Sequence, residues 1–414
     1  MITVAEASER ILARIGVLSG EAVATGNAVG RVLAVPVVSE VDSPPWDNSS
    51  MDGYAVRSAD LRSGSPVSLR VIEDIPAGSF PSRVIEAGET ARVMTGAPVP
   101  GGADSVIRRE DTDDGSSVVS IQNVRDIGKN IRRKSEDFHA GEKIFRAGEA
   151  LTVAHLGALS AAGIKSVTVH RRPKVAIISS GDELVELDEF SPAIAGKKIV
   201  SANSVTLAAL VREAGGEPVD LGIAADDRTS IRDKFEAARD ADLIITSAGV
   251  SVGDHDHVRS AFDELGGDLD FWKVKMRPGA PLAFGVFGGK PWIGLSGNPV
   301  SAIVTFELFA RPAVRKMLGF RFLFRQTFPV RLAHPITLAA HLMHFLRVTI
   351  DRSSTGDMTA KLAGSQSSGV LTAMARSDAL LILAGDRLEL AEGETHRALP
   401  LNENFSAADE LLLT

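Results

Sequence analysis

The stretch Trp292 to Phe309, WIGLSGNPVSAIVTFELF, predicts a buried strand, a glycine loop and an apolar helix in direct succession. Pro299 suits the first position of the helix because its ring fixes φ and it lacks an N–H that would have no partner there. Asn298 is then the N-cap. The first turn of such a helix has unpaired backbone N–H groups, which attract anions. An ordinary strand-to-helix turn has the same elements, so the loop indicates an anion site only together with other residues.

The same succession of short apolar strand, Gly/Ser/Asp loop and helix begins at Lys174 and repeats along the chain. This repeat is typical of βαβ units, whose strands form a parallel sheet. We therefore expect an α/β domain over residues 174–323. Its predicted strands are KVAII from Lys174, PVDLGI from Pro218, DLIIT from Asp242 and WIGL from Trp292.

Two further elements of this domain have clear limits. In residues 271–291, two β-rich runs flank the turn RPGA, which predicts a hairpin inserted before the last strand. A helix is expected to begin near Asn203 as its cap and to end at Gly215 and Gly216.

The flanks of the α/β domain have a different pattern. Residues 324–414 alternate short β runs with turns, so we expect a small β-barrel or sandwich with few helices. Residues 44–137 are rich in short β runs and Gly/Pro turns, which predicts an inserted β-rich domain. Helical patterns at the N-terminus and from Leu151 border this insertion. We assign them to a discontinuous helical/linker domain of residues 1–43 and 138–173, in which the two helices pack together.

Composition excludes several classes of function. The 414 residues are 44% hydrophobic and 24% charged, as in folded globular proteins, and a formal net charge of −8 argues against nucleic acid as the main partner. The absence of Cys excludes disulfides, thiolate catalysis and Cys-based metal centres. No apolar run approaches the ~20 residues of a membrane span. We therefore expect a cytoplasmic protein that binds neither nucleic acid nor membranes.

Polar residues and glycines follow the end of each predicted strand of the α/β domain. Ligands of open α/β sheets bind outside the carboxyl ends of the strands, so we expect these loops to form one site. Glycine backbone and helix ends favour phosphate, whereas clustered carboxylates beside a phosphate require a hard cation such as Mg²⁺. The loops therefore predict a phosphorylated ligand together with Mg²⁺. The residues concerned are Ser180, Gly181, Glu183, Asp226, Gly249, Ser251, Gly253, Asp256, Ser296, Gly297, Asn298 and Pro299.

A set of longer motifs occurs in order along nearly the whole chain. They are DNSSMDGYA at 47–55, RVMTGAPVP at 92–100, RRKSED at 132–137, SSGDEL at 179–184, AGVSVGDHD at 248–256, RPGAPLAFG at 277–285 and GLSGNPVS at 294–301. Together they resemble the MoeA family, the molybdopterin molybdenumtransferases, to which the gephyrin E domain also belongs. The resemblance implies a MoaB/Mog-like α/β domain with the inserted β-rich domain, the helical/linker domain and the C-terminal β-barrel. It also implies that molybdate is ligated to the dithiolene of adenylylated molybdopterin with Mg²⁺-dependent release of AMP.

The resemblance further implies roles for single residues. Catalytic positions would be Asp52, Thr95, Asp137, Glu183, Asp226 and Asp256. Mg²⁺ would be held by Glu183, Asp226 and Asp256. The anionic ligands would be bound by the loop residues named above together with Lys273, Arg277, Arg347 and Ser368. This assignment agrees with the chemistry, because molybdate and a pyrophosphate linkage are anions that cationic side chains neutralise while carboxylates hold the metal.

Three positions depart from the family pattern. Ser296 stands where the family usually has Pro, Ala248 stands where it has a second Gly, and Ala280 stands where it has Lys. The last change removes a positive charge beside an anion site, whereas none of the three removes a carboxylate. We therefore expect an active transferase that reaches half-saturation at a higher oxyanion concentration than relatives with Pro and Lys at these positions.

The sequence leaves other functions and the partners open. A scaffold of the same fold, or a Mg²⁺-dependent nucleotide pyrophosphatase, would have the same elements. A homodimer is predicted from the resemblance and from an N-terminal amphipathic helix that has little local core to cover. Other proteins of cofactor biosynthesis or molybdoenzyme maturation are further candidate partners.

Overall fold

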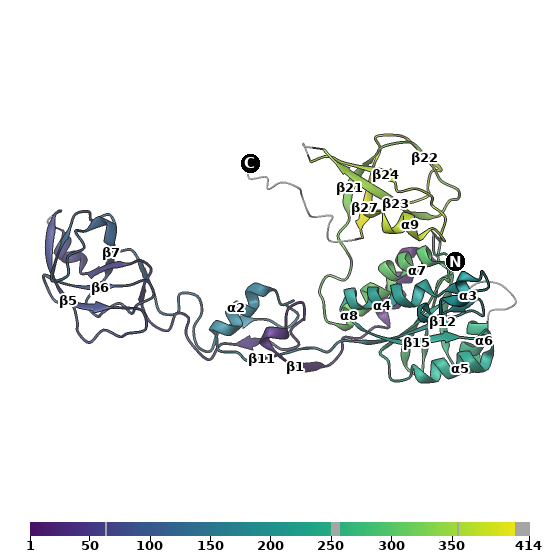
Figure 1. Ribbon diagram of the computed structural model, residues 1–414, viewed down its shortest axis with the longest axis horizontal. Helices are drawn as coiled ribbons and strands as arrows, with labels where there is room; N and C mark the ends of the chain where they lie inside the picture. The colour runs from purple at the N-terminus through teal and green to yellow at the C-terminus, as the bar shows by residue number, and fades with distance from the viewer. Residues whose placement is uncertain (63, 250–256, 354–355, 402–414) are drawn as a thin grey trace. The chain divides into compact units, whose positions relative to one another are not determined.

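The computed structural model describes residues 1–62, 64–249, 257–353 and 356–401. The described chain forms two compact units (Figure 1). The first unit is Met1–Glu21, Gly30–Ala34 and His170–Thr414, and the second is Ala22–Val29 and Val35–Val169.

The α/β part of the first unit is built on a sheet with the strand order β15-β12-β16-β20-β19-β17. The first four strands are parallel neighbours, and β19 pairs antiparallel with both β20 and β17. The four predicted parallel strands and the predicted hairpin are therefore confirmed. The bounds are β12 Lys174–Ser180, β15 Glu217–Ala224, β16 Leu243–Ser247, β17 Asp268–Trp272, β19 Ala283–Phe287 and β20 Lys290–Leu295.

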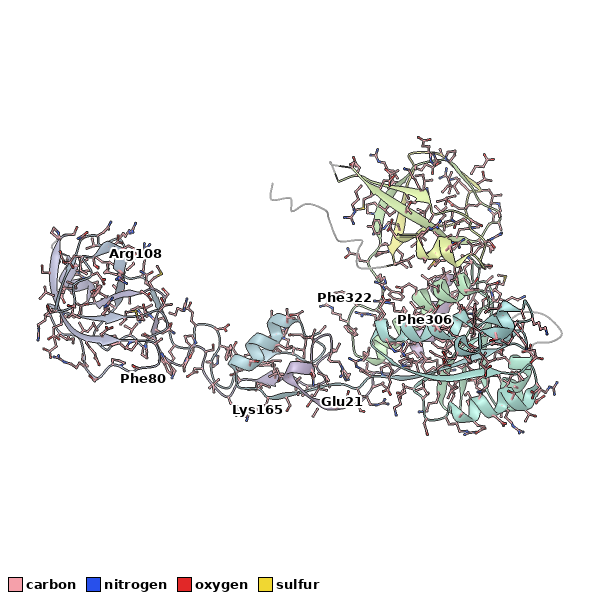
Figure 2. All side chains as sticks on the ribbon, in the orientation of Figure 1. Glu21, Phe80, Arg108, Lys165, Phe306 and Phe322 are labelled. Carbon is pink, nitrogen blue, oxygen red and sulfur yellow. The ribbon has the colours of Figure 1, made fainter. Side chains whose placement is uncertain are left out.

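Helices cover both faces of this sheet (Figure 1), which explains why its central strands are apolar on both sides. On β12, Val175 and Ile177 belong to one buried core, whereas Ala176 and Ile178 belong to the other. Phe306, labelled in Figure 2, is fully buried in the first of these cores. The first face is covered by α4 Ala202–Ala214, α7 Pro299–Thr305, the π-helical turn η5 Phe306–Ala310 and α8 Arg311–Met317. The second face is covered by α5 Arg228–Ala237 and α6 His257–Glu264.

The limits of α4 were predicted correctly at one end and shifted at the other. Gly215 ends the helix with φ 99°, a left-handed conformation that glycine adopts without strain. The N-cap is Ser201 rather than Asn203, which lies inside the first turn. The side chain of Asn203 bonds to the sheet edge instead of capping the helix.

The N-terminal helix α1, Val4–Ala13, packs on the α/β domain. Thr3 and Glu6 form a capping box at its start. Ala7 and Ile11 are fully buried in the core that α8 and η5 also line. The apolar stripe of α1 is therefore covered by residues of the first unit.

The C-terminal part of the first unit is a closed barrel, as predicted. Among the described residues, its five strands pair in the order β23-β24-β21-β27-β25, and β25 returns to pair with β23. A parallel pairing of β18, Met276–Arg277, with β23 joins the barrel to the α/β domain. The bounds are β21 Phe328–Leu332, β23 Met343–Arg352, β24 Met358–Leu362, β25 Ala379–Leu383 and β27 Thr395–Pro400, with the short helix α9 Leu371–Ala375.

The second unit carries a sheet with the order β7-β4-β6-β5-β8, which agrees with the predicted β-rich insertion. Tyr54 is fully buried within it and donates its hydroxyl to Gly115 O at 3.0 Å. Arg108, labelled in Figure 2, forms a two-point ion pair with the buried carboxylate of Asp126 at 2.7 and 3.0 Å. The bounds are β4 Gly53–Val56, β5 Val67–Ile75, β6 Glu89–Val93, β7 Ser105–Arg108 and β8 Val118–Ile121.

Shorter elements complete the second unit. Its helix is α2 Val153–Ala161. Paired short strands are β1 Gly20–Ala24 with β11 Ser166–His170, β2 Val37–Val38 with β10 Lys143–Phe145, and β3 Asn48–Ser49 with β9 Ile131–Arg132. Within the described ranges of both units, none of the helices has the length and apolar character that a membrane crossing needs.

Candidate functional site

A cavity of about 450 Å³ lies at the carboxyl ends of the parallel strands; we call it the strand-edge cavity. The sheet topology explains its position, because the loops after neighbouring parallel strands emerge at one edge. Seven of the predicted binding residues line it: Ser180, Glu183, Gly249, Ser296, Gly297, Asn298 and Pro299. Thus residues separated by more than a hundred positions in the sequence meet here, as the motif analysis expected.

Two of the predicted glycines are required by close contacts. Gly181 has φ 145°, and a Cβ there would lie 2.6 Å from a carboxylate oxygen of Glu183. Gly249 has φ 71°, and a Cβ there would lie 2.0 Å from Val258 Cγ2. Any larger residue would displace the Glu183 carboxylate in the first case and helix α6 in the second. The positive φ values of Gly181 and Gly249 also favour glycine at both positions.

Asp226 is held by Asp182, a residue of the loop after β12 to which the sequence analysis assigned no individual role. The Asp226 N–H donates to Asp182 Oδ1 at 3.0 Å, and the Asp182 N–H donates to Asp226 Oδ2 at 3.3 Å. This reciprocal pair ties together the loops after β12 and β15, which are adjacent in the sheet. Asp226 lies at the same edge as Glu183 but is not among the residues that line the strand-edge cavity.

The predicted metal ligands are the carboxylates of Glu183, Asp226 and Asp256. Within the described ranges, no group of three or more His, Asp or Glu side chains is arranged to hold a metal ion. Ser251, Gly253 and Asp256 of the third loop lie outside the described residues. Glu183 and Asp226 supply carboxylate oxygens, the ligand type that Mg²⁺ prefers. Mg²⁺ is usually bound by one or two carboxylates together with substrate phosphates, so these two residues fit that mode of binding.

The loop from Ser296 to Pro299 has the predicted geometry, but part of its N–H supply is used within the protein. Asn298 is the N-cap of α7 by position, and Pro299 is its first residue. The Asn298 N–H donates to Ser296 Oγ at 3.3 Å, and the Val300 N–H donates to Ser368 O at 3.1 Å. These two groups therefore do not face a ligand. Instead, the second contact fastens the predicted barrel residue Ser368 to the start of the helix.

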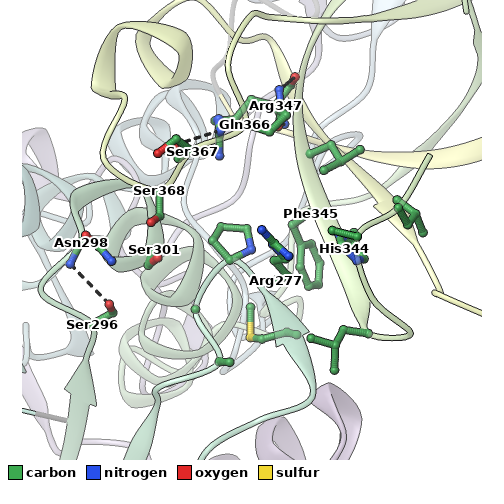
Figure 3. A pocket seen from close by; sticks show the side chains of 18 of the residues that line it. Arg277, Ser296, Asn298, Ser301, His344, Phe345, Arg347, Gln366, Ser367 and Ser368 are labelled. Carbon is green, nitrogen blue, oxygen red and sulfur yellow. Dashed lines mark hydrogen bonds between the residues drawn. The ribbon is translucent and has the colours of Figure 1, made fainter. Parts of the chain in front are cut away.

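A second cavity, of about 630 Å³, lies between the α/β domain and the barrel within the first unit; we call it the barrel-side cavity. Figure 3 shows it with Arg277 and Ser301 on the α/β side and His344 and Arg347 on the barrel side. It shares three lining residues with the strand-edge cavity: Pro281, Ser296 and Asn298. The two cavities therefore meet at the loop with which the sequence analysis began.

Arg347 is the most unusual charge at the barrel-side cavity. Its side chain is fully buried, and its Nη2 donates to Ser365 O at 2.8 Å and to Ser367 O at 3.2 Å. Nε and Nη1 have no hydrogen-bond partner, and no carboxylate pairs with the guanidinium among the residues described. Burial lowers the pKa of Arg347. A buried cation with unused donors is costly unless an anion completes it, so this residue indicates an anion site.

The other two predicted basic residues have different settings. Arg277 is exposed on β18, opposite His344 of β23, and lines the barrel-side cavity. Lys273 has φ 82°, which is uncommon for a residue with a side chain. Its N–H donates to Leu282 O at 2.8 Å. Lys273 is not among the residues lining either cavity.

In the second unit, Asp52 and Thr95 lie in direct contact. The N–H and the hydroxyl of Thr95 both donate to Asp52 Oδ1 at 2.7 Å. These contacts, the backbone one first, hold the pKa of Asp52 below its ordinary value. Asp137 is positioned through its N–H, which donates to Ser43 O at 3.0 Å. Asp52 is therefore a fixed, ionised carboxylate near neutral pH.

Among the lining residues of the strand-edge cavity that the sequence analysis did not name as ligand-binding are Asn203 and Ser247. Ser247 directly follows the predicted strand DLIIT, so its place at the strand end was an available signal. Asn203 was interpreted as a helix cap, which concealed its tertiary contacts.

Two of the residues that depart from the family pattern line the cavities. Ala280 lines the barrel-side cavity. Ala248 lines the strand-edge cavity with φ 79°, where glycine would be unstrained.

Comparison with known protein families gives matches along most of the chain. The MoeA N-terminal region (domains I and II) matches residues 2–163, the probable molybdopterin binding domain matches residues 176–316, and the MoeA C-terminal region (domain IV) matches residues 329–401. The second of these ranges contains every residue of the strand-edge cavity.

Individual relatives agree with the family models. A molybdopterin molybdenumtransferase of Nostoc is 42% identical over 70% of this chain and 68% of its own length. Molybdopterin molybdenumtransferase 2 of Mycobacterium tuberculosis is 39% identical over 88% of this chain and 91% of its own length. The crystal structure of the molybdopterin biosynthesis MoeA protein of Pyrococcus horikoshii superposes with a TM-score of 0.82 at 30% identity, covering 97% of this chain and 100% of that one.

Proposed function

The chain belongs to the MoeA family of molybdopterin molybdenumtransferases, and from this premise we propose that it ligates molybdate to the dithiolene of adenylylated molybdopterin with Mg²⁺-dependent release of AMP. One observation carries the proposal. Two cavities meet at Ser296 and Asn298; one has carboxylate and hydroxyl groups at its wall, and the other has a buried arginine with unused donors. The ligand has a phosphate group at one end and, at the other, the dithiolene that receives the oxyanion. It therefore requires two such neighbouring environments.

The barrel-side cavity supplies the oxyanion site. Nε and Nη1 of Arg347 are buried donors without protein partners, and an oxyanion offers several acceptors for them. Ser365 and Ser367 fix the guanidinium through their carbonyls, so little ordering is lost when the anion binds. Arg277 adds a second positive charge at the wall of the same cavity. Arg347 therefore orients molybdate, and Arg277 raises its local concentration.

The strand edge supplies the metal and phosphate site. Glu183 and Asp226, together with Asp256, would hold Mg²⁺, with ligand phosphate oxygens completing its coordination. The bound cation would neutralise charge on the phosphate linkage that breaks. Asp182 keeps the Asp226 carboxylate in place through the reciprocal bonds described above. Ser180 and the loop at Ser296 border the same cavity and exclude water from the ligand.

The remaining predicted catalytic residues are in the second unit. Asp52 is ionised and fixed by Thr95, so it can act as a hydrogen-bond acceptor for the ligand. We include Asp52, Thr95, Asp137 and Lys273 in the active cleft on the strength of the family motifs. The homodimer also rests on the family resemblance, because the apolar face of α1 is covered within the unit. Sedimentation that shows only monomer at micromolar concentration would contradict the dimer.

The proposed reaction can be separated from its alternatives in one assay. Purified protein is mixed with adenylylated molybdopterin, Mg²⁺ and molybdate, and AMP release and cofactor formation are followed together. We expect both products only when all components are present. AMP release at an unchanged rate without molybdate would identify a nucleotide pyrophosphatase, and the absence of both products would favour a scaffold.

A further inference from the structure

Ser247 lies at the end of β16, where the strand meets the strand-edge cavity. Side chains of a strand alternate between its two faces, and Ile245 two residues earlier belongs to the core that α4 covers. Ser247 is therefore on the α4 side, whereas its neighbour Thr246 accepts a bond from Trp292 Nε1 at 3.1 Å on the other side. Ser247 is almost completely buried from bulk water, yet it lines the cavity.

The first turn of α4 places an amide against this hydroxyl. Asn203 Nδ2 donates to Ser247 Oγ at 2.6 Å and to Gly297 O at 2.9 Å. Because a carbonyl oxygen can only accept, the contact with Gly297 fixes which end of the amide faces the cavity loops. Asn203 as a whole residue is 9% exposed, and its Oδ1 has no partner among the described residues. The Asn203 amide is therefore buried with its oxygen unpaired. An unpaired buried oxygen lowers stability, so its presence here indicates a role in the site.

The amide determines what the hydroxyl can do. Ser247 Oγ already accepts a hydrogen bond from Asn203, so the hydroxyl hydrogen is left for another acceptor. Of the residues that the structure describes, none accepts it from Ser247. Lys and Arg are absent from the described lining of this cavity, so its side chains can donate to an anionic group only through neutral groups, in addition to the proposed Mg²⁺. A hydroxyl polarised by a donor behind it is a stronger donor than an isolated one.

We propose that Ser247 is a ligand-binding residue of the strand-edge cavity, donating its hydroxyl to a phosphate oxygen, and that Asn203 is the positioning residue that orients it. This inference rests on the proposed function, which supplies the phosphate. The phosphate belongs either to AMP or to the phosphate terminus of molybdopterin, and the hydrogen-bond chemistry is the same for both. Asn203 acts on two loops at once, because its second bond holds the carbonyl of Gly297.

The test is equilibrium binding of two probes, AMP and molybdopterin, to the full chain and its variants. Ser247→Ala removes the donor and should weaken binding of one of the two probes roughly 10- to 100-fold, the usual range for a hydrogen bond to a charged group. Ser247→Thr keeps the hydroxyl and should restore most of the affinity. Thr246→Val removes the neighbouring hydroxyl on the opposite face and should bind as the wild type does.

A double-mutant cycle tests the positioning role of Asn203. Asn203→Ala should cost affinity for the same probe as Ser247→Ala, and the double variant should bind no more weakly than the worse single variant, because the amide acts through the hydroxyl. Fully additive losses would overturn the positioning role. Wild-type affinity in Ser247→Ala, with wild-type binding measurable, would overturn the inference alone. If the wild type binds neither probe, the proposed function fails and this inference fails with it.

Discussion

Replacing Arg347 by Met tests whether the buried guanidinium is present for an anion rather than for stability. Met is unbranched and of comparable length, so it fills the same space without a charge. In the wild type, Arg347 is fully buried and uses only Nη2 in hydrogen bonds within the protein. Replacing a buried side chain that the fold requires usually destabilises the protein strongly. We expect Arg347→Met to change the stability much less.

The magnitudes follow from the contacts. Burying an unpaired cation costs several kcal/mol, and burial lowers the pKa of Arg347 for this reason. The two bonds to the carbonyls of Ser365 and Ser367 return about 1.5–3 kcal/mol each. These contributions nearly cancel, so Arg347→Met should change the free energy of unfolding by less than about 2 kcal/mol. Two charge-assisted bonds to molybdate would be lost, so half-saturation should need at least about tenfold more molybdate.

Two measurements on the same protein check this prediction. Urea unfolding gives the change in stability, and AMP release as a function of molybdate concentration gives the change in half-saturation. Arg331→Met, which replaces an exposed arginine on another barrel strand, is the matched control and should leave both unchanged. Wild-type dependence on molybdate in Arg347→Met would refute the anion site. A loss of stability above ~4 kcal/mol would show that Arg347 is a structural residue instead.

Three further changes have defined outcomes. Thr95→Val removes the hydroxyl but keeps the N–H that binds Asp52, so a carbon NMR titration should show the pKa of Asp52 rising part of the way toward its ordinary value near 4. Because the folded pKa is depressed, the hydroxyl contact stabilises the wild type above that pH, and this stability is lost as the pH falls through the folded pKa. Asp226→Asn removes a carboxylate beside the proposed metal and should lower the rate of AMP release by at least ~100-fold. Ser296→Pro combined with Ala280→Lys restores stiffness and a cation at the barrel-side cavity, which should lower the molybdate concentration at half-maximal rate roughly fivefold while the maximal rate changes by less than about threefold.

Each of these predictions has a contrary result. An unchanged pKa of Asp52 in Thr95→Val would show that the hydroxyl contact is not formed in solution. Near-normal AMP release by Asp226→Asn, or full activity of the wild type in chelator, would remove Mg²⁺ from the account. An unchanged dependence on molybdate in the folded double variant would mean that the departures at positions 280 and 296 are neutral.

The α/β domain could be predicted from sequence because its strands are buried on both faces and its loops contain distinctive residues. Strand β12, for example, contains the apolar run VAII, which is typical of a central strand of a covered sheet. The start of α4 was misplaced because capping preference sees only local contacts. Ser201 and Asn203 are both good caps, and only the position of Ser247 across the sheet edge decides that Asn203 is used elsewhere.

Packing between distant segments was the harder part. The amphipathic pattern of α1 shows that one face is buried but not against what, and Ile11 is in fact buried with α8 of the first unit. The candidate site shows the same limit. Glu183 and Asp226 could be named from motifs, whereas the reciprocal bonds between Asp182 and Asp226 depend on two loops that meet only in the folded sheet.

The most direct test of the central claim is the ratio of AMP released to molybdenum bound in a single turnover. The full chain is loaded with adenylylated molybdopterin and Mg²⁺, molybdate is added, and AMP and pterin-bound molybdenum are quantified at successive times. The account predicts that the two rise together in equal amounts and that neither appears before molybdate is added. AMP that appears without molybdate, or in large excess over bound molybdenum, would contradict it.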